Sequence, residues 1–229
     1  YAPLQKEVKR NNIKVLAAYF TDIGLLVSTK PVRKLEDLRG MRIRTYAGFW
    51  TQVGRALGWV PVATATPEVY EALKTGLVEG IDHFPAGDIP IFKFQEQAKY
   101  FVDWGAGTHA IMFCIMNSYR WSSLPAEIKE YFQRVQDGLP EASARIYNQM
   151  YEKKYPQIAE AGVQFSVLPL QEMKRWKESL LPARNEWLKM LEGRAGSVVW
   201  DFTERFGTLA RRYEGQSRYK HPFSFVEQH

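Results

Sequence analysis

Hydrophobic and polar positions alternate with two different periods between residues 42 and 84. Segments 42–45, 60–63 and 81–84 have the length of short strands, and the first and last of them carry charged or polar residues among apolar ones. Between them, apolar residues recur three and four positions apart, which is typical of helices with one buried face. Thr66 is expected to cap the second of these helices. The pattern therefore predicts strand, helix, strand, helix, strand, the repeating unit of an α/β protein with a parallel sheet.

A helical period dominates the chain from about Leu124 onward. An apolar stripe runs from Ile128 to Leu139 and resumes beyond Pro140. The stripe predicts one long helix that the proline kinks or restarts. Residues 163–167 then fit a return strand.

Two further amphipathic helices are predicted at residues 171–191 and 197–213. Pro182 is expected to bend or divide the first of them. The tryptophans of both helices fit core packing better than ligand binding. Residues 216–229 show no clear period and are predicted to form a loosely attached tail.

Strands are also expected at residues 13–20 and 110–116. Every residue of the second run is apolar, which is typical of a strand buried on both faces. Cys114 lies within this run, so a buried structural thiol is expected rather than a catalytic one. A single cysteine cannot form a disulfide within the chain, and it does not identify the compartment.

The composition fits a globular protein with a sizeable core, because 45% of the 229 residues are hydrophobic and 14% are aromatic. No apolar run approaches the roughly 18 residues of a membrane-spanning helix. The first residues are polar, without a signal peptide or an initiator methionine. Tyr1 is therefore not expected to be the natural start.

The net charge of +6 raises a second hypothesis, a basic module that binds nucleic acid. The basic residues concerned lie near the C-terminus: Arg205, Arg211, Arg212, Arg218 and Lys220. Because acidic residues such as Glu204 and Glu214 alternate with them, a solvated charged face is the favoured interpretation. Such a face would attract acidic solutes or a membrane partner, and no nucleic acid is expected.

An enzymatic function finds little support in the sequence. The four histidines, at positions 83, 109, 221 and 229, lack the spacing of metal ligands. The sequence also has no cysteine pair, no phosphate-binding glycine loop and no Gly-x-Ser-x-Gly elbow. The chain is not expected to be an enzyme, and neither a metal nor a cofactor is expected.

Candidate binding residues follow the carboxyl ends of the predicted strands, where open α/β sheets bind ligands. Arg44, Tyr46, Asp82 and His83 lie at those ends. Arg44 is the strongest candidate, because a guanidinium matches the planar shape of a carboxylate. Three of them have a structural alternative: Arg44 could pair with a surface carboxylate, His83 could be a core histidine bonded to the backbone, and Asp82 could only cap a helix or form an ion pair.

Several segments together resemble one known family, the solute-binding proteins of TRAP (tripartite ATP-independent periplasmic) transporters. They occur in the family's order and at close to its spacing, at residues 37–44, 57–62 and 68–80 and, more weakly, 93–100 and 117–125. The resemblance covers nearly the whole chain.

The resemblance implies an α/β, two-lobed periplasmic-binding-protein-like fold with a long lobe-bridging helix. Lobe I is expected at residues 1–22 and 109–148, and lobe II at 23–108 and 149–229. Because the family begins with strands and helices that this sequence lacks, the first lobe is expected to be incomplete. An incomplete lobe should expose a sheet edge and apolar surface.

The resemblance also implies a function, that of a periplasmic subunit that captures an organic acid and delivers it to the membrane permease of a TRAP transporter. In that family the arginine matching Arg44 forms a bidentate salt bridge with the substrate carboxylate, and a hinge closes over the substrate. His83 replaces an asparagine that is common in the family, and Thr66 replaces an aromatic residue. A reshaped pocket is therefore expected.

The expected substrate is a monocarboxylate with an apolar or aromatic body. The alternative is a short dicarboxylate whose second acid group is held by a protonated His83. The predicted ligand-binding residues are Arg44, Tyr46, Phe49, Trp50, Thr66, Asp82, His83, Phe84, Trp104, Thr108 and His109.

Overall fold

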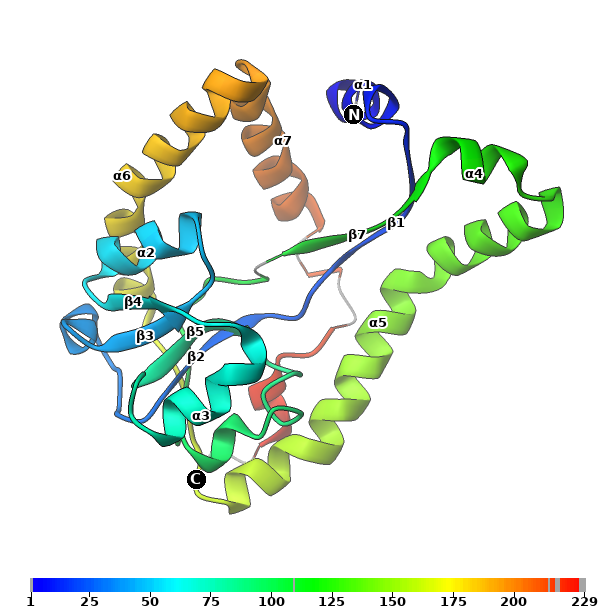
Figure 1. The fold of residues 1–229 in the computed structure, drawn as a ribbon. Coiled ribbons are helices and arrows are strands. Elements are labelled where there is room, and N and C mark those ends of the chain that lie inside the picture. The colour runs from blue at the N-terminus through cyan, green and yellow to red at the C-terminus, as the bar shows by residue number, and fades with distance from the viewer. Residues whose placement is uncertain (1, 109, 214, 217–218, 227–229) are drawn as a thin grey trace.

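The computed structural model describes residues 2–108, 110–213, 215–216 and 219–226. The described strands form two sheets, one of six strands in the order β4-β3-β5-β2-β6-β8 and one that pairs β1 with β7 (Figure 1). The strands are β1 (Ile13–Phe20), β2 (Gly24–Ser28), β3 (Arg42–Thr45), β4 (Val60–Ala63), β5 (Gly80–Pro85), β6 (Tyr100–Asp103), β7 (Ile111–Asn117) and β8 (Gln164–Val167). The α-helices are α1 (Ala2–Arg10), α2 (Phe49–Leu57), α3 (Val69–Lys74), α4 (Ser118–Ser123), α5 (Ala126–Glu160), α6 (Leu170–Ala195) and α7 (Val198–Tyr213). Short 3-10 helices lie at η1 (Leu35–Leu38), η2 (Thr66–Glu68), η3 (Phe94–Glu96) and η4 (Pro222–Phe225).

The predicted strand–helix unit forms half of the large sheet. Strand β3 pairs in parallel with β4 on one side and with β5 on the other, and α2 and α3 lie between these strands in the chain. Gly58 ends α2 in the left-handed conformation with a φ of 89°, which a glycine adopts without steric cost. The prediction of an α/β unit is confirmed, although antiparallel pairing of β2 with β5 and β6 makes the whole sheet mixed.

Helices cover both faces of the large sheet and create two cores. On one face α2 and α6 enclose a core that includes Ile43, Leu57 and Trp176. On the other face α3 and the end of α5 enclose a core that includes Leu73 and Tyr155. We call the face of the sheet covered by α2 and α6 the α2 side, and the face covered by α3 and the end of α5 the α3 side. The side chains of successive strand residues point to opposite faces, so each one lies on one of these two sides.

Strand β5 contains a bulge at Asp82 and His83. Opposite these two residues β2 has only Leu26, because the register shifts between the flanking pairs. His83 takes a φ of 55°, which is uncommon for any residue but glycine. Ile81 and Phe84 lie in the α3-side core, whereas Asp82 and His83 both contact aromatic residues on the α2 side. The bulge thus places two polar neighbours on the same face.

Two chain segments pass side by side between the sheets, one from β1 to β2 and one from β6 to β7. The Thr21 amide donates to the Ala110 carbonyl at 3.0 Å, and the Gly24 amide donates to the Gly107 carbonyl at 2.9 Å. Helix α5 is a third connection, since it packs on β1 and also contributes to the α3-side core. The two sheets are therefore joined by a hydrogen-bonded pair of crossings and one helix.

Strand β7 is not buried, contrary to the sequence-based prediction. Met112, Phe113 and Ile115 are 45%, 48% and 55% exposed, and Cys114 is exposed as well. Within the described residues β7 pairs with a single strand, β1, and an apolar run alone cannot show whether anything covers it. The prediction of a buried thiol is therefore wrong, and the expected apolar surface is present on this sheet.

Helix α5 continues for 35 residues through Pro140 and Pro156, and α6 continues through Pro182. Of the two alternatives predicted at each proline, a restart at Pro140 and a division at Pro182 are therefore wrong, and a kink or bend without interruption of the helix remains. A proline removes one backbone hydrogen bond, and the turns on either side keep the helix continuous. None of the described helices combines the length and the apolar character that a membrane crossing needs.

Residues 219–226 are not the loosely attached tail that the sequence predicts. The Tyr219 hydroxyl donates to Asp22, and the His221 ring lies 3.0 Å from the Asp103 carboxylate. Phe223 is only 5% exposed and belongs to the α3-side core. The segment is too short to show a period, so its attachment could not be read from spacing.

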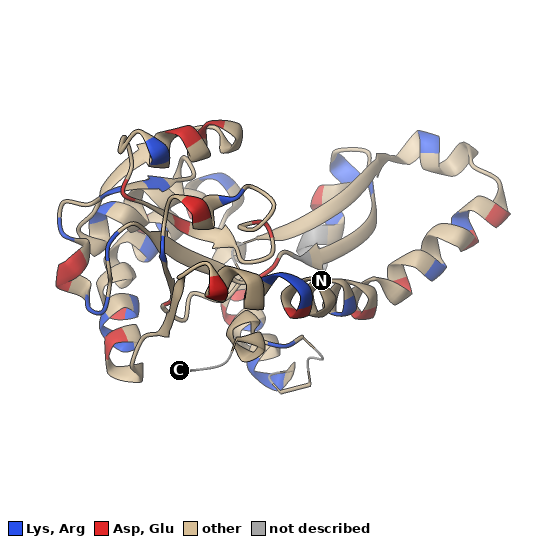
Figure 2. Ribbon diagram, turned by 90° about the horizontal axis from the view of Figure 1, so that it is seen from below, with Lys and Arg blue, Asp and Glu red and all other residues tan. Residues whose placement is uncertain are grey.

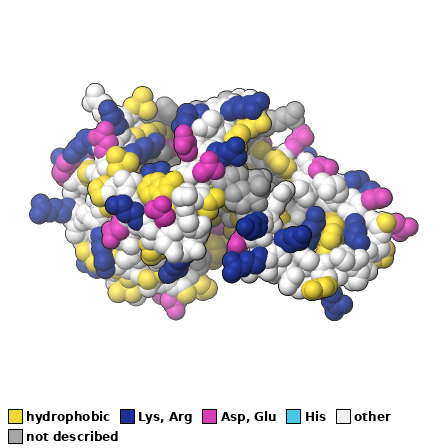
Figure 3. Space-filling model, turned by 90° about the horizontal axis from the view of Figure 1, so that it is seen from above, with side chains coloured by type: hydrophobic (Ala, Val, Ile, Leu, Met, Phe, Trp, Pro, Cys, Tyr) yellow, Lys and Arg dark blue, Asp and Glu magenta, His cyan; other side chains and the backbone are white. Residues whose placement is uncertain are grey.

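Charged side chains of both signs are interleaved over the surface (Figures 2 and 3). Within the C-terminal basic group, Arg205 pairs with Asp201 at 3.8 Å, and Arg218 lies outside the described residues.

Candidate functional site

Arg44 lies on β3 with its side chain on the α3 side of the sheet, and it is only 2% exposed. Its Nε and Nη2 atoms donate to the Thr64 carbonyl at 3.3 and 3.2 Å. Nη2 also donates to the Thr66 hydroxyl at 3.2 Å. The guanidinium carbon lies 4.2 Å from the centre of the Tyr46 ring and 5.9 Å from that of Phe84. Two polar contacts and two aromatic faces therefore fix its position.

The third nitrogen of this guanidinium, Nη1, is buried and has no hydrogen-bond partner among the described residues. No described carboxylate forms an ion pair with Arg44 either. An arginine stays charged in any protein environment, and burying a charge without an anion is costly. The alternative of a surface ion pair therefore does not describe Arg44, and Nη1 is the atom that remains for an outside acceptor.

Thr66 is the first residue of η2 and does not cap it, because the cap is the preceding residue. Ala65 is the N-cap of η2, and its amide donates to the Glu68 carboxylate at 3.2 Å. The Glu68 carboxylate thus accepts the hydrogen bond at the N-terminus of η2. The Thr66 hydroxyl instead accepts a hydrogen bond from Arg44. The prediction of Thr66 as a helix cap is wrong, whereas its place beside Arg44 agrees with its inclusion among the candidate residues.

Asp82 is fully buried on the α2 side of β5. The Trp104 indole nitrogen donates to Oδ1 at 3.3 Å, and Oδ2 has no hydrogen-bond partner among the described residues. Burial raises the pKa of Asp82 to about 7, because the hydrogen bonds from Trp104 and from the His83 backbone do not offset the loss of water. Asp82 forms no ion pair with a described residue and caps none of the described helices.

His83 lies in a stack of aromatic rings. Its ring is 4.4 Å from that of Trp50 in a stacked arrangement and 6.0 Å from that of Trp104. A Cβ atom at Gly24 would lie 2.7 Å from the His83 ring, so only glycine fits there. The Phe49 ring packs against Trp50 in a tilted arrangement, with the two ring centres 5.9 Å apart. The unusual backbone conformation of His83 is thus held by close packing on both sides.

The structure brings nine of the predicted residues into two groups joined by β5. The first group surrounds the guanidinium on the α3 side: Arg44, Tyr46, Thr66 and Phe84. The second group lies on the α2 side: Phe49, Trp50, Asp82, His83 and Trp104. Both groups lie toward the carboxyl ends of β3 and β5, as expected for a ligand site of an α/β sheet.

The remaining two candidates are not part of these groups. The Thr108 hydroxyl donates to the Thr21 carbonyl at 2.5 Å in the crossing between the sheets. His109 lies outside the described residues. For the described residues, no group of three or more His, Cys, Asp or Glu side chains could hold a metal ion.

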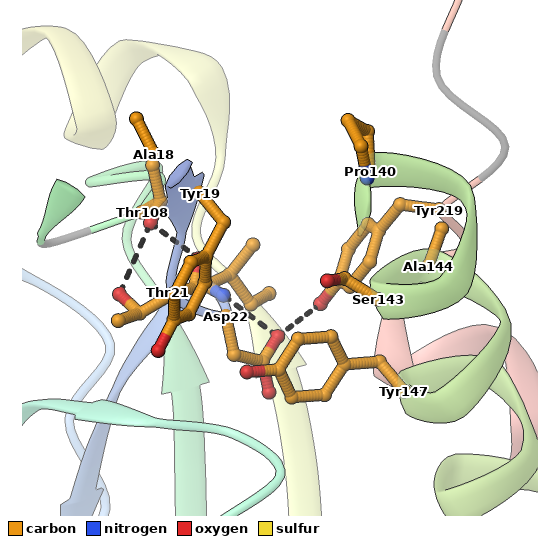
Figure 4. A pocket seen from close by; sticks show the side chains of 11 residues that line it. Ala18, Tyr19, Thr21, Asp22, Thr108, Pro140, Ser143, Ala144, Tyr147 and Tyr219 are labelled. Carbon is orange, nitrogen blue, oxygen red and sulfur yellow. Dashed lines mark hydrogen bonds between the residues drawn. The ribbon is translucent and has the colours of Figure 1, made fainter. Parts of the chain in front are cut away.

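Sequence reasoning missed a cavity of about 470 Å³ between the crossing segments and α5 (Figure 4). Thr108 lines it, together with residues that no motif singled out. The most polar of these is Asp22, which is 2% exposed, and Tyr19, Tyr147 and Tyr219 contribute rings. The tyrosines at 147, 151 and 155 recur every fourth residue, and this spacing on one helix face was the available signal.

A family model of bacterial extracellular solute-binding proteins, family 7, matches residues 2–190. The C4-dicarboxylate-binding periplasmic protein DctP of Rhodobacter capsulatus is 26% identical over 187 residues, which are 80% of this chain and 55% of that protein. The chain therefore spans little more than half the length of this relative.

Solved structures show the same fold. A TRAP periplasmic solute-binding protein from Desulfovibrio salexigens with bound orotic acid has a TM-score of 0.73 at 24% identity, covering 92% of this chain and 67% of that one. The periplasmic ectoine-binding protein of the TeaABC TRAP transporter of Halomonas elongata has a TM-score of 0.76 at 19% identity, covering 86% and 65%. Because the family model covers most of the chain, the chain belongs to family 7 of the bacterial extracellular solute-binding proteins.

Proposed function

We propose that this chain captures an organic acid by its carboxylate at Arg44. The observation that carries the proposal is the buried Nη1 atom, which has no acceptor among the described residues. A carboxylate oxygen on Nη1 would neutralise the buried charge and use the unpaired donor. Because Nε and Nη2 already donate to Thr64 and Thr66, the ligand would approach from the Nη1 side of the fork. A bidentate salt bridge through Nη1 and Nη2 would require Thr66 to release its hydrogen bond.

The similar proteins support this class of ligand. The ligands of these proteins are a C4-dicarboxylate, orotic acid and ectoine, and each of these carries a carboxylate. The rest of the molecule differs widely among them. A common carboxylate contact with variable surroundings is what one arginine within an adaptable pocket would provide.

For the remainder of the ligand we favour an apolar or aromatic body. The rings of Tyr46 and Phe84 lie beside the guanidinium, and Trp50 lies beyond β5 with His83 stacked on it. The alternative is a short dicarboxylate with a protonated His83 as its second cation. Affinity for a dicarboxylate would then fall as the pH rises, whereas affinity for a neutral aromatic body would not.

The proposed cellular role is delivery of this acid to the permease subunits of a TRAP transporter. The division into lobes at 1–22 with 109–148 and 23–108 with 149–229 is part of the proposal. Closure of the lobes over the ligand would give the permease one conformation to recognise, and a ligand stabilises whichever conformation it binds more tightly.

Calorimetric titration with succinate, orotate and phenylacetate tests the carboxylate contact. We expect one class of acid to bind, and Arg44→Ala to weaken it at least about a hundredfold, since loss of one partner of a buried ion pair costs roughly 3–5 kcal/mol. Arg42→Ala is the matched control, because Arg42 lies on the same strand, with a half-exposed side chain that pairs with Glu79. Retained affinity in Arg44→Ala would refute the assignment.

A further inference from the structure

The cavity of about 470 Å³ described above lies apart from both groups of candidate residues around Arg44 and His83. One wall comes from the end of β1 and the crossing that follows it, and the other from the middle of α5 (Figure 4). Its volume lies within the range of about 300–1,000 Å³ that is usual for small-molecule sites. It is large enough for a ligand of its own.

The lining combines aromatic rings with one carboxylate. Tyr19 projects from the strand side, Tyr147 and Tyr219 from the opposite side, and Asp22 lies between them (Figure 4). The other described lining residues are uncharged: Ala18, Thr21, Ile23, Thr108, Pro140, Ser143 and Ala144. No described lining residue is a lysine, an arginine or a histidine. The chemistry of this cavity is therefore opposite to that of the Arg44 site.

The contacts of Asp22 are those of an ionised carboxylate. Its oxygens accept from the backbone amide of Ile23 at 2.7 Å, from the amide of Gly87 and from the hydroxyl of Tyr219. Amide groups only donate, so both oxygens act as acceptors. Burial raises the pKa of Asp22 above its usual value, and the hydrogen bonds from Tyr151, Tyr219 and the backbone amides of Gly87 and Ile23 act in the opposite direction by favouring the ionised form beside the tyrosine rings.

The surroundings extend this negative potential. Asp88 lies close enough to Asp22 that the pKa of Asp88 is raised, first by burial and then by the Asp22 charge. The pKa of Tyr147 is raised by burial and then by both aspartates. A cation inside the cavity would experience attraction from the carboxylates as well as from the ring faces.

We propose that this cavity binds a small organic cation of the quaternary-ammonium type, held by the faces of the three tyrosines and by the charge of Asp22. Such a cation presents an apolar surface to the rings and spreads its charge over methyl groups, so it loses little hydration on entering an apolar site. A carboxylate ligand would be repelled by Asp22, which separates this site from the one proposed at Arg44.

Choline and its uncharged isostere 3,3-dimethylbutan-1-ol are suitable probes for titration calorimetry on the intact protein. The two molecules have nearly the same shape and hydroxyl group and differ in charge. We expect choline to bind and the alcohol to bind at least about tenfold more weakly. Equal binding of both, or binding of neither, would overturn the proposal.

Three variants locate the site. Tyr147→Leu should weaken choline binding roughly tenfold, whereas Tyr147→Phe keeps the ring face and should retain it within about threefold. Arg44→Ala should leave choline affinity unchanged, and its loss in that variant would show that the cavity is not an independent site. Because the organic-acid titration reports on Arg44 alone, failure of one proposal does not imply failure of the other.

Discussion

Arg44 and Asp82 are both buried charged side chains of the large sheet, but they can be stabilised in different ways. Arg44 cannot lose its proton and therefore needs an anion or enough acceptors. Asp82 can become neutral by taking up a proton, and burial raises its pKa to about 7. Under the proposed function an organic acid would supply the anion for the arginine, whereas uptake of a proton suffices for the aspartate.

The raised pKa of Asp82 predicts a dependence of stability on pH. The unfolded carboxyl group ionises near its ordinary value of 3.8, and the folded one near 7, so between these values the folded state binds more protons. The free energy of unfolding must then fall as pH rises through this window. Asp82→Asn removes this term, so from pH 5 to pH 7 the wild type should lose about 2 kcal/mol relative to the variant.

Urea denaturation at pH 5 and pH 7 measures this difference. Asp137→Asn is the control, because Asp137 is exposed on α5. The Asp137 variant should follow the wild type at both pH values. An Asp82→Asn variant that also follows the wild type would contradict the buried, proton-binding carboxyl group.

At the scale of elements, two glycines inside helices have opposite surroundings. A Cβ atom at Gly54 of α2 would lie 2.0 Å from the Trp59 indole nitrogen, whereas one at Gly138 of α5 would meet nothing within 4 Å. Alanine is otherwise favoured over glycine in a helix by about 1 kcal/mol. The close approach of α2 to Trp59 therefore depends on the missing side chain.

Replacement of each glycine by alanine tests this difference. We expect Gly54→Ala to destabilise the fold by about 1–3 kcal/mol through overpacking, and Gly138→Ala to stabilise it by about 0.5–1 kcal/mol. Chemical denaturation monitored by tryptophan fluorescence measures both. Equal effects of the two substitutions would show that α2 does not rest on Trp59 as closely as the structure places it.

Local signals explain which elements could be predicted from sequence. The strands and helices between Arg42 and Phe84 follow short periods, so their order and parallel pairing were predictable. The exposure of β7 and the continuity of α5 through Pro140 depend on what surrounds each element. Spacing along the chain carries no information about those neighbours.

At the scale of the whole molecule, spacing along the chain also fails to show which distant residues meet to form a binding site or cavity. Arg44 and His83 could be proposed because both follow predicted strands of one sheet. The cavity could not, because Asp22, Tyr147 and Tyr219 meet only through the path of the entire chain. The bulge at His83, which turns it toward Trp50, also depends on pairing with a distant strand.

The packing of residues 219–226 predicts that the end of the chain contributes to global stability. Phe223 is 5% exposed within the α3-side core, whereas Phe113 on β7 is 48% exposed. Phe223→Ala should therefore lower the free energy of unfolding by about 3 kcal/mol, and Phe113→Ala by less than about 1 kcal/mol. Urea titration of both variants measures the difference, and a neutral Phe223→Ala would show that the segment is not held in the core.

The paired crossings between the sheets have a mechanical consequence. Two extended segments joined edge to edge by hydrogen bonds form a flat ribbon, which flexes easily out of its plane and resists shear within it. Independent strands would allow the two halves to twist, slide and swing. We therefore expect relative motion of the two halves to occur mainly as bending of this ribbon, and we expect α5, which packs on β1 and contributes to the α3-side core, to limit the range of that bend.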